Sequence, residues 1–84
     1  MHKVLIERPA ERDLKQLEPR VQTRVIQAIR VLAADPYPRG CQKLAGSTAD
    51  WRIRVGDYRI VYEIDKSART ITVTRIRHRR EVYR

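Results

Sequence analysis

The spacing of apolar residues changes once along the chain, from a helical period to a period of two. The short apolar run 4–6 predicts a first strand. Between residues 9 and 32, apolar residues recur at helical spacing, which predicts two helices that each turn one apolar face inward. Pro9 and Pro19 suit the first turn of a helix, so the two helices form a hairpin. The apolar positions are Ala10, Leu14 and Leu17 in the first helix and Val21, Val25, Ala28, Ile29 and Leu32 in the second.

Turn residues end the helical region at 35–40, where the sequence reads Asp-Pro-Tyr-Pro-Arg-Gly. Residues 41–50 show no clear period, and we expect a loop in which a turn at 43–46 docks Leu44. From Trp51 onward, apolar and polar residues alternate, which predicts strands over 51–55, 58–64 and 70–77. Gly56 and Asp57 fit a type II′ hairpin turn, because glycine suits its first central position.

The predicted order of elements is therefore β-α-α-β-β-β. We expect one small α+β domain over residues 1–84, with the helical hairpin packed on one face of a mainly antiparallel sheet. A chain of 84 residues is too short for a second domain that binds a cofactor.

The predicted hairpin turn sets the register of its two strands and places Arg54 opposite Arg59. One face of the hairpin also carries Arg52, and like charges directly opposite one another destabilise a sheet. Three clustered guanidinium groups therefore favour a bound polyanion. The alternative is a solvated face on which Glu63 is a partial counter-charge. The other face is apolar and is predicted to pack on the helices; it carries Trp51, Ile53, Val55, Tyr58, Ile60, Tyr62 and Ile64.

The last strand places a histidine near these arginines. If Ile71 and Val73 join the core, His78 falls on the arginine face, unless a bulge reverses the register. A histidine in that position is a candidate proton donor or acceptor near neutral pH, and the alternative is an ordinary surface residue. Tyr83 has three candidate roles: packing on the sheet edge, stacking on a base, or acting through its hydroxyl.

The charge of the chain points to an anionic partner. Its 19 Lys and Arg residues exceed its 10 Asp and Glu residues, for a formal net charge of +9. Residues 51–84 hold ten basic side chains, nine of them Arg, and four acidic ones, which leaves +6. Arginine is preferred where planar contact with phosphate matters, so a nucleic acid or an acidic protein is favoured over simple solvation.

Several classes of protein are excluded by composition. One Cys rules out an internal disulfide framework, and two His residues leave no Cys/His zinc cluster. The sequence lacks an apolar run long enough to span a bilayer and lacks the pattern of a signal peptide. We expect a cytoplasmic protein with no membrane partner, no cofactor and no metal.

The stretch 51–64, Trp-Arg-Ile-Arg-Val-Gly-Asp-Tyr-Arg-Ile-Val-Tyr-Glu-Ile, followed by 77–84, Arg-His-Arg-Arg-Glu-Val-Tyr-Arg, resembles the RelE/ParE toxin superfamily. The resemblance covers the whole chain and is nearest to the RelE branch of type II toxin–antitoxin systems. It implies an endoribonuclease that cuts mRNA in the A site of the 70S ribosome. In that reaction the 2′-hydroxyl attacks the adjacent phosphate without a metal. The implied partners are a RelB-like antitoxin, the ribosome and mRNA, with a monomeric free toxin and a toxin–antitoxin oligomer.

The resemblance also implies roles for individual residues. Arg52 and Arg54 match positions that are often Lys in the family, and Arg59 matches its phosphate-binding Arg. Arginine is not deprotonated in proteins, so Arg52 and Arg54 are expected to stabilise charge and not to act as bases. Proton transfer is then expected from His78 and Tyr83 in the tail; the alternative is slow cleavage that relies on orientation of the mRNA in the ribosome. The family's tail arginine matches Arg77 or, preferably, Arg79. The expected catalytic residues are Arg52, Arg54, Arg59, His78, Arg79 and Tyr83, and the expected RNA-binding residues are Lys43, Arg77, Arg80 and Arg84.

Two other functions stay open at this point. One is ParE-like inhibition of DNA gyrase without cleavage. The other is a non-catalytic module that binds RNA or the ribosome. A cluster of arginines beside a titratable group favours the ribonuclease over both.

Overall fold

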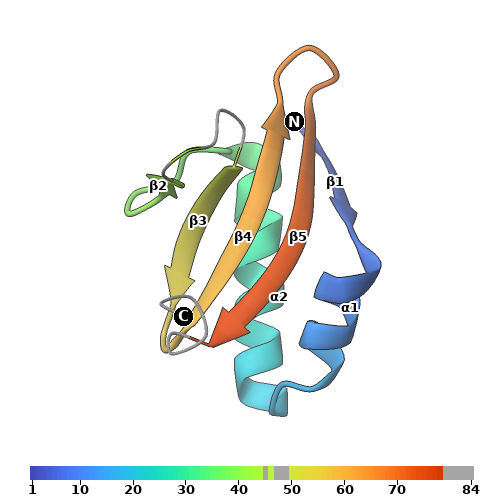
Figure 1. The fold of residues 1–84 in the computed structure, drawn as a ribbon, viewed down its shortest axis with the longest axis vertical. Coiled ribbons are helices and arrows are strands. Elements are labelled where there is room, and N and C mark those ends of the chain that lie inside the picture. The colour runs from blue at the N-terminus through green and yellow to red at the C-terminus, as the bar shows by residue number, and fades with distance from the viewer. Residues whose placement is uncertain (45, 47–49, 79–84) are drawn as a thin grey trace.

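The computed structural model describes residues 1–44, 46 and 50–78. Two helices and five strands follow one another along this part of the chain (Figure 1). Their bounds, in chain order, are β1 (Lys3–Ile6), α1 (Arg8–Lys15), α2 (Pro19–Ala34), β2 (Gln42–Lys43), β3 (Asp50–Val55), β4 (Tyr58–Asp65) and β5 (Thr70–His78).

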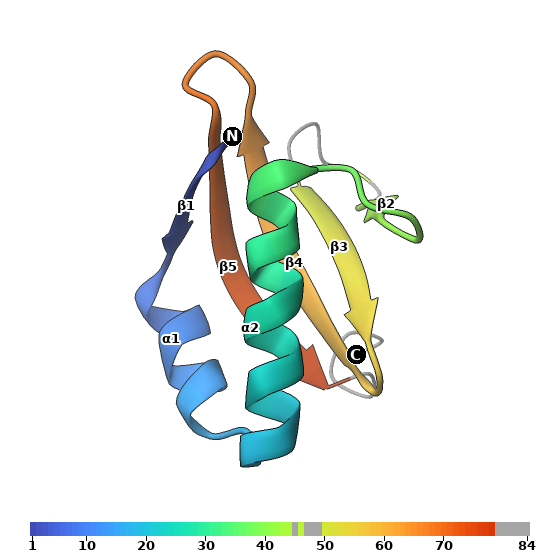
Figure 2. The same ribbon diagram turned by 180° about the vertical axis from the view of Figure 1, so that it is seen from behind.

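The five strands form one mixed sheet in the order β1-β5-β4-β3-β2. Only β1 and β5 run parallel, and the other neighbouring strands are antiparallel. The helix α2 crosses one face of the sheet, and α1 lies beside the end of β5 (Figures 1 and 2). The α+β fold with a helical hairpin on one face is confirmed. The two-residue strand β2 was not predicted, because so short a run in an aperiodic segment shows no alternation.

The core lies between α2 and the sheet, where the two periodic patterns meet. The apolar stripe of α2 faces apolar side chains of β4 and β5, as the spacing predicted. Side chains that lie further out on β3 and on α1, among them Trp51 and Leu14, are half-buried against this cluster. The buried apolar residues are Ala10, Val25, Ile29, Leu32, Ile60, Tyr62, Ile71, Val73 and Ile76.

The turn between β3 and β4 has the predicted geometry and sets the predicted register. Gly56 adopts φ +60°, and Asp57 does not have a positive φ, which fits the first and second central positions of a type II′ turn. Arg54 pairs with Arg59 across β3 and β4. The guanidinium of Arg24, from α2, lies 3.4 Å from where a Cβ on Gly56 would be placed.

A bulge in β5 reverses the direction of its last side chains. Val61 pairs with Arg75 and Tyr62 pairs with Val73, so Thr74 is the extra residue between the two pairs. The hydroxyl of Thr74 donates to the carbonyl oxygen of Val61 at 3.2 Å and supports the bulge. After this point, residues of even number in β5 face the core, as buried Ile76 shows.

The helix α1 covers the edge of β5 that β1 leaves open. The last bond from the β1 side joins the Glu7 N–H to the carbonyl oxygen of Val73 at 2.9 Å. Beyond it, Asp13 accepts the backbone N–H of Ile76 at 2.9 Å. Asp13 also accepts the Nε and Nη2 groups of Arg75 at 2.8 Å and 3.2 Å. A carboxylate thus takes the place of a neighbouring strand.

Candidate nucleic-acid interface

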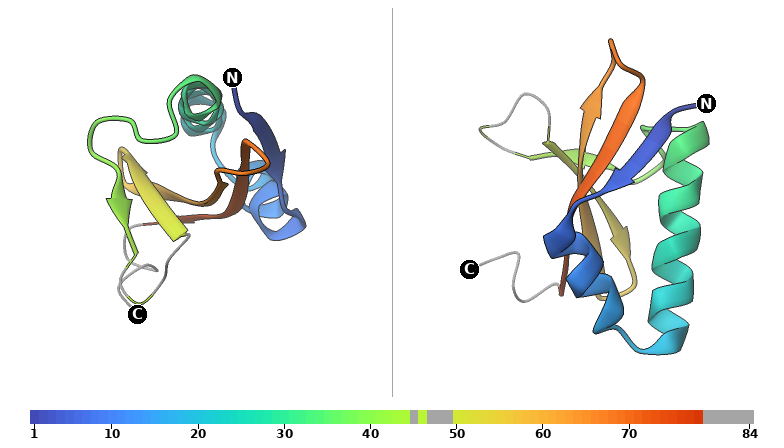
Figure 3. Two further views of the ribbon diagram at one scale, coloured as in Figure 1. Left: turned by 90° about the horizontal axis from the view of Figure 1, so that it is seen from above. Right: turned by 90° about the vertical axis from the view of Figure 1, so that its right-hand side faces the viewer.

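The two described helices lie on one face of the sheet (Figure 3). The other face, called the open face below, has no helix over it among residues 1–44, 46 and 50–78. Strand pairing arranges the side chains of the open face in rows that cross the strands. The first row joins Arg54, Arg59 and Arg77 on β3, β4 and β5. Directly opposite side chains have Cβ atoms about 5 Å apart, so three arginine side chains leave the sheet next to one another.

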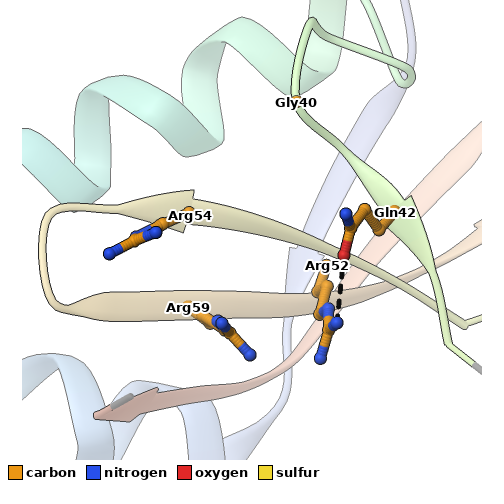
Figure 4. A pocket seen from close by; sticks show the side chains of 5 residues that line it. All are labelled: Gly40, Gln42, Arg52, Arg54 and Arg59. Atoms are coloured by element: carbon orange, nitrogen blue, oxygen red, sulfur yellow. Dashed lines mark hydrogen bonds between the residues drawn. The ribbon is translucent and has the colours of Figure 1, made fainter.

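The second row of the open face continues the positive charge. It joins Gln42, Arg52, Val61 and Arg75 on four strands. Arg52 Nη2 donates to Gln42 Oε1 at 3.0 Å, which holds this guanidinium toward β2 (Figure 4). Arg54 Nε donates to the carbonyl oxygen of Gly56 at 3.2 Å. Both arginines therefore keep further N–H groups that can donate to a ligand.

Three of these arginines, Arg52, Arg54 and Arg59, line a pocket of about 290 Å³ (Figure 4). Arg59 is 7% exposed and has an arginine opposite it on each neighbouring strand, Arg54 on β3 and Arg77 on β5. An anion in the pocket would offset the repulsion between these like charges, and phosphate geometry matches the guanidinium fork. The pocket is lined by Gly40, Gln42, Arg52, Arg54 and Arg59.

The segment after α2 supplies one wall of this pocket and is tied to the sheet. The hydroxyl of buried Tyr62 donates to the carbonyl oxygen of Pro36 at 3.0 Å, and burial raises the pKa of that hydroxyl. Leu44 N–H donates to the carbonyl oxygen of Asp50 at 2.9 Å. The sequence did not single out Gly40 or Gln42, because only the pairing of β2 with β3 brings them to the arginines.

The prediction that His78 shares a face with the arginines is wrong. The bulge at Thr74 reverses the register, so His78 pairs with Tyr58 and faces the helices. The two rings meet edge to face, with their centroids 5.2 Å apart. His78 lines a separate pocket of about 150 Å³ on the helix side, with Asp13, Gln16, Leu17, Tyr58 and Ile76. The same bulge places Arg77 opposite Arg59, where His78 was expected.

The other predicted residues are only partly brought together. Lys43 pairs with Trp51, whose side chain lies on the helix side, so Lys43 faces away from the arginine rows. The predictions for the tail, at Arg79, Arg80, Tyr83 and Arg84, lie outside the described residues. The described part of the site therefore consists of Arg52, Arg54, Arg59 and Arg77.

The far end of the open face is acidic. Asp50 pairs with Glu63, which pairs with Thr72 in the next strand. The pKa of Glu63 is raised, first by partial burial and then by the nearby carboxylates of Asp50 and Glu7. Glu63 therefore does not neutralise the arginine rows, as the solvated-face alternative supposed, but belongs to a separate group of like charges.

The chemistry available at this site is that of charge stabilisation. Among residues 1–44, 46 and 50–78, His, Cys, Asp and Glu form no cluster of three or more that could hold a metal ion. In the same part of the chain, no helix is long and apolar enough to cross a membrane. The guanidinium groups can bind a phosphodiester and stabilise charge that develops on it, but they cannot accept a proton.

Comparison with known proteins gives consistent matches over nearly the whole chain. Residues 4–83 match the family described as the ParE toxin of the type II toxin–antitoxin system parDE. Toxin RelG of Mycobacterium tuberculosis is 35% identical over 79 residues, which cover 89% of this chain and 87% of that protein.

Solved structures match the fold over similar lengths. The RelBE2 toxin–antitoxin complex of M. tuberculosis has a TM-score of 0.82 at 30% identity and covers 93% of this chain and 98% of that chain. The archaeal RelE–RelB complex of Pyrococcus horikoshii has a TM-score of 0.83 at 25% identity and covers 93% of this chain and 94% of that chain. The isolated RelE toxin of E. coli gives 0.82 at 20% identity, covers 99% and 92%, and is similar in fold alone.

Proposed function

Because the chain belongs to the RelE/ParE superfamily of type II toxin–antitoxin toxins, we propose that it is a ribosome-dependent endoribonuclease that cleaves mRNA. The observation that carries this proposal is the row of three arginines, Arg54, Arg59 and Arg77, on the open face. Inhibition of a protein target does not require guanidinium groups at this spacing, whereas a phosphodiester offers several oxygen acceptors to them.

The proposed reaction needs no group outside the protein, the ribosome and the RNA. The 2′-hydroxyl oxygen attacks the adjacent phosphorus and loses its proton, and the bond to the 5′-oxygen of the next nucleotide breaks. The products are a 2′,3′-cyclic phosphate and a free 5′-hydroxyl, which takes up a proton. Arg59 and its neighbours in the row stabilise the charge that builds on the phosphate oxygens.

Proton transfer in this proposal is assigned to the tail, with Tyr83 as the candidate. His78 faces the helices, so the proposal gives it no contact with the scissile phosphate. Arg79 and Arg80 stay candidate phosphate ligands. If the tail supplies no proton-transfer group, orientation of the mRNA in the ribosome and the arginine row carry the rate.

A RelB-like antitoxin is the proposed partner of this chain. Two of the similar structures are complexes of a toxin with its antitoxin, from M. tuberculosis and from P. horikoshii. The basic open face suits an acidic segment of such a partner, which would compete with RNA for the same arginines. We expect a monomer when the toxin is free and a larger assembly when the antitoxin is bound.

Inhibition of DNA gyrase is the second candidate, and one observation favours it. The family that residues 4–83 match is described as the ParE toxin. The two candidates differ in their products, since a ribonuclease leaves new 5′ ends on mRNA and a gyrase inhibitor leaves mRNA intact.

The test is primer extension on mRNA bound to purified ribosomes, with a gyrase supercoiling assay on the same preparation. We expect cleavage by the wild-type chain and a 10²–10³-fold slower rate for Arg54→Gln, the scale for losing one charge-stabilising donor. Arg30→Gln is the matched control, because it removes an equal charge from an exposed position of α2. Intact mRNA together with inhibited supercoiling would reject the ribonuclease in favour of the second candidate.

A further inference from the structure

The charge of the open face reverses along its strands. The first two rows form its basic end, defined by Arg52, Arg54, Arg59 and Arg77. The third row joins Asp50, Glu63, Thr72 and Leu5, and the fourth joins Asp65, Thr70 and Lys3. Glu7 is two residues after Leu5, and its carboxylate contributes to the raised pKa of Glu63. The acidic end is defined by Glu7, Asp50, Glu63 and Asp65.

Three carboxylates of the acidic end act on one another at Glu63. Asp50 on β3 pairs with Glu63, and Glu7 follows β1. Partial burial raises the pKa of Glu63 first, and the carboxylates of Asp50 and Glu7 raise it further. Lys3 is the one cation among the described residues that the pairing places in these two rows. A ligand that crosses the whole open face therefore meets opposite potentials at its two ends.

The distance between the two ends restricts what fits them. Arg59 and Glu63 lie on the same strand and are four residues apart, which corresponds to about 13 Å of extended chain. An α-helix covers the same distance in roughly nine residues. A protein segment of two to three helical turns is therefore long enough to reach both ends.

We propose that the open face binds an antitoxin segment with acidic side chains over the basic end and basic side chains over the acidic end. This inference rests on the proposed function, which supplies the antitoxin as the partner. RNA is an anion along its whole length, so it matches the basic end and is repelled by the acidic end. The two ligands share the arginines and differ at Glu63.

Three probes distinguish these contacts. The first is an 18-residue helical peptide with Glu and Lys clusters on one face, centred nine residues apart. The second peptide has the same composition with the charges intermixed, and the third probe is a short single-stranded RNA. Fluorescence anisotropy at low salt measures the affinity of each. We expect the segregated peptide to bind the wild-type chain about tenfold more tightly than the mixed one, because only it pairs opposite charges at both ends.

Reversal of one charge at the acidic end gives the decisive comparison. Glu63→Lys should weaken binding of the segregated peptide about fivefold and strengthen RNA binding. Glu63→Gln should change both affinities in the same directions by smaller factors. Glu11→Lys is the matched control, because it makes the same change of net charge at an exposed position of α1. Circular dichroism checks that each variant keeps its fold.

The inference is supported if Glu63→Lys weakens the affinity for the segregated peptide and strengthens the affinity for RNA. Equal affinity of the two peptides for the wild-type chain, including no binding of either, overturns it. The inference is also overturned if Glu63→Lys changes the affinities for the segregated peptide and for RNA in the same direction. The same holds if its effect on these affinities is no larger than that of Glu11→Lys. The proposed ribonuclease acts on mRNA held by the ribosome and is judged by the ribosome assay. If the short free RNA does not bind the wild-type chain, the two peptides and their response to Glu63→Lys decide the inference.

Discussion

Replacement of Asp13 tests whether one carboxylate replaces a missing strand at the edge of β5. Its two oxygens accept three hydrogen bonds, two from Arg75 and one from the backbone N–H of Ile76. The Asp13 side chain is 17% exposed and that of Arg75 is 42% exposed. The backbone bond therefore lies in the more buried part of the cluster, and the ion pair lies nearer to water.

The expected size of the effect follows from this difference in exposure. Asp13→Ala leaves the Ile76 N–H without its acceptor, which costs about 1–3 kcal/mol. Loss of the partly exposed ion pair adds about 1 kcal/mol or less. We expect a total of about 1–4 kcal/mol, which is a large fraction of the stability of a small domain. In a domain of this size, each kcal/mol lowers Tm by roughly 4–8 °C.

Two further variants separate the contributions. Asp13→Asn keeps a carbonyl oxygen for Ile76 N–H and loses the charge. Arg75→Ala removes the ion pair and leaves the Asp13 carboxylate bonded to Ile76 N–H. Both should cost about 1 kcal/mol or less. Urea titrations followed by circular dichroism give the free energy of unfolding of all three variants. If Asp13→Ala is no less stable than Arg75→Ala, the backbone bond carries no stability and the strand-replacement argument is refuted.

Three other predictions concern single positions. His78→Gln should slow cleavage by less than about tenfold, because His78 faces the helices; a loss of about 10²–10⁴-fold in the ribosome assay would show that it acts as a general base or acid. Glu63→Gln should raise Tm at neutral pH, because the raised pKa of Glu63 means that its charged form destabilises the fold; the gain should vanish in thermal scans at a pH below the ordinary pKa of glutamate. Gly56→Ala should lower the free energy of unfolding by about 1–2 kcal/mol, because φ is +60° there and Arg24 lies close; an unchanged urea midpoint would contradict this.

The helices and the β3–β4 hairpin were predictable because the buried side of each element shows in the spacing of its apolar residues. Helical spacing in α1 and α2 identified Ala10, Val25 and Leu32 as core residues, and all three are fully buried. Alternation over β3 and β4, together with a glycine suited to a type II′ turn, predicted the pairing of Arg54 with Arg59. Turn geometry and a two-residue period are properties of a few neighbouring residues, so no long-range information was needed.

The sequence alone offers two candidates for the tail arginine. Arg77 and Arg79 both match the family's position, and the sequence favours Arg79. The described structure places Arg77 in the row with Arg59, and Arg79 lies outside the described residues. The role of each tail residue in catalysis stays a prediction.

By itself, the sequence determined the order of elements, the inner and outer faces of the β3–β4 hairpin, and a cluster of like charges that favours a polyanion. Only the tertiary structure decided which residues of β5 join that cluster. A β-bulge inserts one residue and exchanges the two faces of every residue after it, so Thr74 sends Arg77 to the arginines and His78 to the helices. Alternation along one strand carries no signal for that insertion, because the bulge is formed with the partner strand: Thr74 donates to the carbonyl oxygen of Val61 on β4, and Asp13 of α1 accepts the N–H of Ile76 just after it.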